Sequence, residues 1–64
     1  MAASDQSEAR IRCLTGRIDA LVIARQTLRT HRATHDELES NRLELVTRQR
    51  ELSFALIEHE RLAA

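Results

Sequence analysis

Length, composition and charge restrict this chain to a small helical protein. Its 64 residues allow one domain at most, and a single core of this size rarely supplies more than about 3–5 kcal/mol. The one cysteine excludes an intrachain disulfide, and the ten basic and ten acidic residues balance, which argues against a nonspecific polyanion binder. The lack of proline, the single glycine and the many good helix formers predict an all-α fold whose core another chain completes.

Residues 1–6 are expected to form a short flexible tail. They contain no basic region followed by an apolar run, which is the pattern of a signal peptide. The longest apolar run, Ala20 to Ala24, is far shorter than the roughly 20 residues that cross a bilayer. Together with the lone cysteine, these features lead us to expect a cytoplasmic protein with no membrane partner.

Residues 7–31 are expected to form the first helix. Asp5 and Glu8 have the spacing of a capping box, which favours a helix start close to them. Apolar residues then recur at alternating intervals of three and four, and Arg25 interrupts this pattern at one seam position. The spacing predicts the core residues that this helix contributes to a hairpin: Ile11, Leu14, Ile18, Leu21 and Leu28.

A turn is expected over residues 32–35. Thr34 and Glu37 also have capping-box spacing, which indicates that a second helix begins there, and no large apolar residue occurs between Arg29 and Glu37. Neither glycine nor proline forces a break, so one continuous helix is the alternative. Because an uninterrupted helix of about 55 residues is rare in globular proteins, we favour the hairpin.

The second helix is expected over residues 36–62. Leucines recur along one side of it and predict the other half of the hairpin core. Polar side chains share this seam, where they either select one register or reach past the core to water. The expected core leucines are Leu38, Leu45, Leu52 and Leu56, and the polar residues on the same seam are Arg42, Gln49 and His59.

A turn near His35 sets the expected pairing of the two seams. Ile18 then meets Leu52, and Arg25 meets Leu45. This pairing puts the dry layers toward the open end of the hairpin and the polar layers toward the turn. The expected architecture is an antiparallel helical hairpin that dimerises into a four-helix bundle.

A second apolar stripe on residues 36–62 has no place in the hairpin core. It lies well over about 60° around the helix from the leucine seam. A helix with two apolar stripes needs two neighbours, so one neighbour must come from another chain. We expect this surface to form a homodimer or an interface with a different protein through Leu43, Val46, Phe54 and Ile57.

Small side chains follow one side of the first helix at Ala9, Cys13, Gly16, Ala20 and Ala24. They either let a partner helix approach closely or fill a solvent-exposed face. Glycine costs about 1 kcal/mol relative to alanine in a helix interior, and a close contact is one reason to find Gly16 there. We expect Ala20 and Ala24 to belong to the interface, and Cys13 to be a small buried hydrophobe.

No catalytic, cofactor or metal site is expected. His31 and His35 stand four residues apart, but they straddle the expected turn and lack a third ligand, so we interpret them as solvated. The sequence contains no recognisable acid–base pair, activated nucleophile or phosphate-binding loop. A hairpin also offers little concave surface for a small-molecule substrate, so we expect a non-enzymatic protein.

Three functions fit these features. The first is a regulator, inhibitor or adaptor of phage or plasmid type that docks on a larger protein. The second is RNA binding by a basic edge of the first helix, formed by Arg10, Arg17, Arg29 and Arg32. In length and hairpin design the chain resembles the Rop family of plasmid copy-control proteins, which implies an RNA-binding four-helix bundle. The third is a structural subunit of a larger complex.

Overall fold

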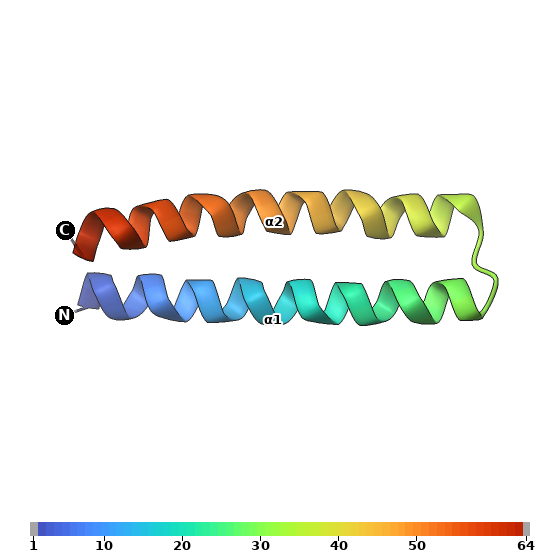
Figure 1. Ribbon diagram of the computed structural model, residues 1–64, viewed down its shortest axis with the longest axis horizontal. Helices are drawn as coiled ribbons and strands as arrows, with labels where there is room; N and C mark the ends of the chain where they lie inside the picture. Colours follow the sequence, from blue (N-terminus) through green and yellow to red (C-terminus); the bar gives the residue numbers. More distant parts are fainter. Residues whose placement is uncertain (1, 64) are drawn as a thin grey trace.

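Two long helices joined by a short turn make up the described part of the chain. The computed structural model describes the backbone of residues 2–63 and the side chains of residues 5–63. Helix α1 spans Ala2–Thr30 and helix α2 spans His35–Ala63, and they run antiparallel (Figure 1). The Cα atoms extend over 46 × 14 × 12 Å. The expected all-α hairpin is confirmed, and the alternative of one continuous helix is wrong.

The first helix begins earlier than expected. The tail expected over residues 1–6 is helical from Ala2 onward, and Met1 lies outside the described residues. Asp5 therefore lies inside α1 rather than at its N-cap. Alanine at positions 2 and 3 is the best helix former, and neither glycine nor proline interrupts this segment, so nothing in the sequence stops the helix at residue 7.

The turn ends α1 with a residue in the left-handed conformation. Arg32 has a φ of 55°, in a region that glycine adopts most readily. Its N–H donates to the Arg29 carbonyl oxygen at 3.2 Å, and the Ala33 N–H donates to the Leu28 carbonyl oxygen at 2.9 Å. This Schellman motif satisfies two carbonyl groups at the end of α1 that have no intrahelical donor.

Thr34 caps the start of α2, as its spacing from Glu37 predicts. The Glu37 N–H donates to Thr34 Oγ1 at 3.2 Å, and the Thr34 N–H donates to Glu37 Oε1 at 3.2 Å. This reciprocal pair of bonds confirms the central capping box. The segment between the helices is residues 31–34, one residue earlier than the expected turn.

Helix α1 contacts α2 through the predicted seam. From Asp5 onward, the α1 side chains that are withdrawn from solvent alternate at intervals of four and three, the period of two helices that wrap around each other. The five predicted core residues are all among them. The α1 seam consists of Ser7, Ile11, Leu14, Ile18, Leu21, Arg25 and Leu28.

Helix α2 is rotated relative to the expected seam. Placing Leu56 in the core is wrong, because this side chain is 48% exposed, and Arg42 and Gln49 are also exposed. The prediction continued from each leucine to the residue four positions later, whereas the structure uses the residue three positions later. The α2 seam consists of Leu38, Asn41, Leu45, Arg48, Leu52, Ala55 and His59.

This rotation brings complementary groups of the two helices together. Arg17 Nη2 lies 2.7 Å from Glu44 Oε1 on the flank of the seam. Asn41 is buried between the helices, where it accepts a hydrogen bond from Arg25. The first contact requires Glu44, three positions after Asn41, to lie on the side of α2 that is turned toward α1, and the second requires Asn41, three positions after Leu38, to face α1.

The pairing of the two seams differs from the expected register by one to two helical turns, because Arg25 bonds to Leu38 and Asn41, which lie seven and four residues before Leu45. Arg25 Nη1 donates to the Leu38 carbonyl oxygen at 3.1 Å rather than meeting Leu45. The reason is that the chain reverses before Thr34 rather than near His35. Expected pairs such as Ile18 with Leu52 are displaced by the same shift.

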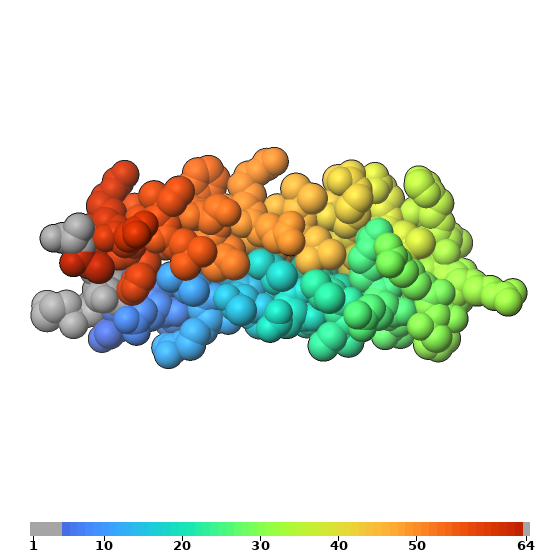
Figure 2. Space-filling model, in the orientation of Figure 1, coloured from blue at the N-terminus to red at the C-terminus, as the bar shows by residue number. Residues whose placement is uncertain are grey.

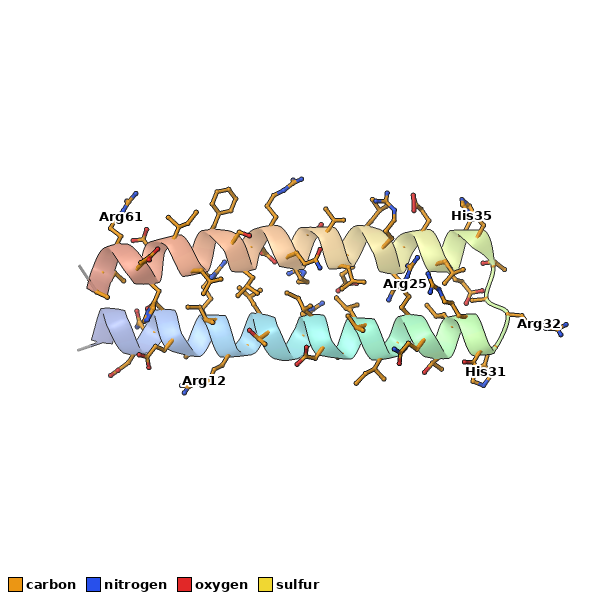
Figure 3. All side chains as sticks on the ribbon, viewed as in Figure 1. Arg12, Arg25, His31, Arg32, His35 and Arg61 are labelled. Carbon is orange, nitrogen blue, oxygen red and sulfur yellow. The ribbon has the colours of Figure 1, made fainter. Side chains whose placement is uncertain are left out.

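Polar layers lie at both ends of the hairpin. Near the turn, Arg25 points into the space between the helices (Figure 3). At the open end, Ser7 Oγ and His59 Nδ1 share a hydrogen bond of 2.6 Å. The open end, where the dry layers were expected, therefore also holds a polar pair.

The hydrophobic core is one row of side chains deep. Figure 2 shows the two helices in contact along the length of the hairpin. Within the described part of the chain, the buried apolar side chains are Leu14 and Ala55, and no large side chain is fully buried. Most of the surface of each helix therefore stays in water, as expected for a chain this short.

Replacing Arg32 with glycine should stabilise the hairpin by about 1 kcal/mol, because glycine has no Cβ to oppose the left-handed conformation.

Replacing Thr34 with alanine should destabilise the hairpin by about 1 kcal/mol, because α2 loses its N-cap. Urea unfolding followed by far-UV circular dichroism measures both. A loss of stability in Arg32→Gly would contradict the left-handed turn.

Candidate protein interaction surface

Four apolar side chains line the outer side of α2, and we call them the outer stripe. The exposed fractions are 52% for Leu43, 38% for Val46, 66% for Phe54 and 56% for Ile57. At about 100° per residue, these side chains fall within an arc of about 80°. This arc lies opposite the α2 seam. The hairpin itself thus leaves in water the second apolar stripe that the sequence predicted.

A shallow hollow adjoins the outer stripe toward the open end of the hairpin. Its volume is about 480 Å³, and two of the four stripe residues line it. Protein interfaces often bury a large aromatic side chain in or beside a hollow of this kind as an anchor residue. The lining residues are Ser7, Arg10, Phe54, Ala55, Ile57, Glu58 and Arg61.

Other exposed apolar side chains are scattered around the hairpin. Val22 and Ile23 are exposed on α1, and Leu56 and Leu62 on α2. Leu56 lies about 120° around α2 from the centre of the outer stripe, so it does not extend that surface. Single exposed hydrophobes are normal on proteins, whereas a contiguous stripe marks a candidate interface.

The small residues of α1 face solvent. Ala9, Gly16, Ala20 and Ala24 are exposed, and a Cβ added at Gly16 would meet no atom within 4 Å. No other part of the described chain packs closely against Gly16. The expectation that Cys13 is buried is wrong, because the seam passes on the other side of α1 and leaves this thiol exposed. An interface role for Ala20 and Ala24 stays a prediction.

A polar cluster joins the two helices near the turn. Asn41 Nδ2 donates to the Leu21 carbonyl oxygen at 3.0 Å, and Asn41 Oδ1 accepts from Arg25 Nη1 at 3.2 Å. Because these bonds form only at one rotation and one register of α2, the cluster favours the observed pairing. Sequence reasoning recognised Arg25 as a seam residue but missed Asn41, which the three-then-four spacing from Leu38 to Leu45 could have identified.

Ion pairs flank the seam and stay in contact with solvent. The hydrogen bond from Arg17 lowers the pKa of the Glu44 carboxyl below its ordinary value. A hydrogen bond from Arg42 likewise lowers the pKa of Glu39, within α2 itself. Exposed pairs of this kind contribute little to stability. The Arg17–Glu44 pair nevertheless links the two helices, because its partners come from α1 and α2.

The four arginines expected to contact RNA do not form one edge. Arg17 is paired with Glu44, and Arg29 lies about 100° or more around α1 from Arg10 and Arg17. Arg32 projects from the tip of the turn (Figure 3). Arg10 lines the hollow beside Glu58 and Arg61, toward the other end of the hairpin. The structure therefore does not place these four arginines along one edge, and RNA binding stays a prediction.

The two histidines beside the turn do not converge on a metal site. Figure 3 shows His31 and His35 pointing away from the hairpin on opposite sides. His31 Nδ1 donates to the Thr27 carbonyl oxygen at 2.8 Å. Over the residues whose side chains are described, no group of three or more His, Cys, Asp or Glu side chains is arranged to hold a metal ion.

Comparison with known proteins gives no information on what this surface binds. No family model, curated protein or solved structure matches this chain. Over the described residues, neither α1 nor α2 combines the length and the apolar character that a bilayer-spanning helix needs. The outer stripe is the feature of the described surface that an intrachain contact does not explain.

Replacing Asn41 with leucine should destabilise the hairpin by about 1–3 kcal/mol, because Arg25 loses an acceptor and the Leu21 carbonyl loses a donor. The double variant Arg25→Leu/Asn41→Leu should recover most of this loss, since an apolar layer replaces the whole cluster. Urea unfolding of the two single variants and the double variant measures the coupling. Additive losses would show that the two side chains do not act together.

The Arg17–Glu44 pair predicts a weak loss of stability in acid. A lowered carboxyl pKa means that the paired form stabilises the fold above the ordinary glutamate pKa of about 4.3, and that this contribution disappears as the pH falls toward the folded-state pKa. Glu44→Gln should reduce the acid-dependent loss, measured as unfolding midpoints between neutral pH and strong acid. Glu60→Gln is the control, because Glu60 has no ion pair among residues 5–63.

Proposed function

We propose that this chain is a small non-enzymatic interaction module, a regulator, inhibitor or adaptor, that docks the outer side of α2 on another protein chain. The observation that carries the proposal is the outer stripe, in which Phe54 is 66% exposed and three further apolar side chains share its arc. Burial of apolar surface contributes about 25 cal/mol per Å² to association. A partner that covers this stripe gains that contribution without disturbing the seam.

The thin core supports the same proposal. Leu14 and Ala55 are the buried apolar side chains of the described chain, and the seam also holds Arg25, Asn41 and Arg48. A hairpin with so little buried apolar surface has a small margin of stability. A partner on the outer side of α2 would add a second layer and stabilise the folded state by mass action.

Phe54 is the residue on which we expect the interface to centre. It is the single phenylalanine of a chain without tyrosine or tryptophan, and its ring lines the hollow at the open end. Interfaces concentrate their binding energy in a few large side chains of this kind. Leu43 and Val46 then extend the contact toward the turn.

Phe54→Asp should remove partner binding while leaving the helical content unchanged, because the side chain faces away from the seam. Gln49→Asp is the matched control, since it introduces the same charge at an exposed position of α2 away from the outer stripe. The tagged chain and both variants are compared by capture from the native host followed by mass spectrometry. Sedimentation of the purified chains runs in parallel and detects homodimers, which would use the same surface to build a four-helix bundle. Equal capture and equal sedimentation for all three chains would contradict the proposal.

A further inference from the structure

An arginine lies at the centre of the outer stripe. Arg50 follows Val46 by four residues and precedes Phe54 by four, with Leu43 and Ile57 seven residues away on either side. At about 100° per residue, all four apolar side chains fall within about 40° of it. A partner that covers the stripe therefore also covers Arg50.

Arg50 differs from the other arginines of α2 in having no ion pair. Arg42 lies 2.6 Å from Glu39, Arg48 lies 2.7 Å from Glu51, and Arg61 lies 3.8 Å from Glu58. The residues three and four positions from Arg50 are Val46, Thr47, Ser53 and Phe54, none of them acidic. Among the described side chains Arg50 has no carboxylate partner, so its charge is available to another molecule.

This arrangement restricts the chemistry of the partner. Covering an unpaired guanidinium with apolar groups removes it from water without compensation, which strongly opposes binding. We propose that the partner is an amphipathic helix with a glutamate or aspartate at its centre, flanked on both sides by apolar residues. The carboxylate pairs with Arg50, and the apolar residues pack against the two halves of the outer stripe. This inference rests on the proposed function, since it names the occupant of the same surface.

A second copy of this chain does not offer that chemistry when it uses the same surface. The outer stripe is symmetric in sequence about Arg50, with Val46 and Phe54 on either side and Leu43 and Ile57 beyond them. A two-fold contact between two outer stripes therefore brings the two Arg50 side chains together at its axis. Like charges at the centre of an interface disfavour the self-association and act as a specificity element.

The length of the stripe sets the length of the partner. From Leu43 to Ile57 the helix rises about 21 Å at 1.5 Å per residue. A partner helix of about four turns spans this distance. Its apolar residues recur at helical spacing on both sides of the central carboxylate, as in other helices that lie against a helical surface.

A displayed library of 18-residue amphipathic helices tests the inference, with the central position open to all amino acids. The immobilised full chain should enrich glutamate and aspartate at that position, and the Arg50→Glu variant should enrich lysine and arginine. A glutamate-centred helix should bind Arg50→Glu on the order of 30-fold more weakly than the unmodified chain. Arg12→Glu is the control and should behave like the unmodified chain, because Arg12 points away from α2 on the opposite side of the hairpin (Figure 3).

The outcomes separate the inference from the proposed function. Helices that are lost with Phe54→Asp but show no acidic preference would overturn the inference and leave the proposed function standing. If no selected helix depends on Phe54, both fail. Stable self-association of the purified chain that Phe54→Asp disrupts, and that a glutamate-centred helix cannot displace, would show a second copy in place of the proposed partner and would also overturn the inference.

Discussion

Each helix of a two-helix hairpin has a single neighbour, and this constraint governs the rest of the structure. Only the side chains that face the other helix leave water, so each helix contributes one row to the core. The two helices meet the constraint differently. The outer side of α1 carries small residues such as Ala9 and Gly16 and one bulky apolar residue, Ile23, whereas the outer side of α2 carries Phe54 and three bulky aliphatic side chains. The excess of apolar surface is thus concentrated on α2.

The sequence predicted α1 and the turn better than it predicted α2. The α1 pattern of large apolar residues continues at one helical period from Ile11 to Leu28, so only one seam fits it. Beyond Leu52, α2 offers both Ala55 and Leu56, and hydrophobicity alone favours the leucine. In the structure Ala55 faces α1, because the same rotation of α2 lets Asn41 form hydrogen bonds with Arg25 and with the Leu21 carbonyl group. The periodicity of a single helix does not reveal hydrogen bonds between two helices.

Some features of the candidate surface could be predicted from the sequence, and others are visible only in the structure. The outer stripe follows from helical spacing, because exposure on α2 depends on periodicity along a single element. Arg50 stands out only because the other arginines of α2 form ion pairs, and these pairs are known from the positions of their side chains in the structure. The four arginines do not share one edge for a different reason. Arg29 lies about 100° or more around α1 from Arg10 and Arg17, and Arg32 lies in the turn rather than on α1.

The outer stripe and the seam occupy opposite sides of α2, and this separation has an evolutionary consequence. A change at residue 43, 46, 50, 54 or 57 alters what the surface recognises without requiring compensation between the helices. A change at Asn41 does the reverse, since this side chain bonds to α1 and lies on the side of α2 opposite the outer stripe. Residues that determine binding can therefore change without changing those that hold the two helices together. A few substitutions along one side of α2 would give the same hairpin a new binding partner.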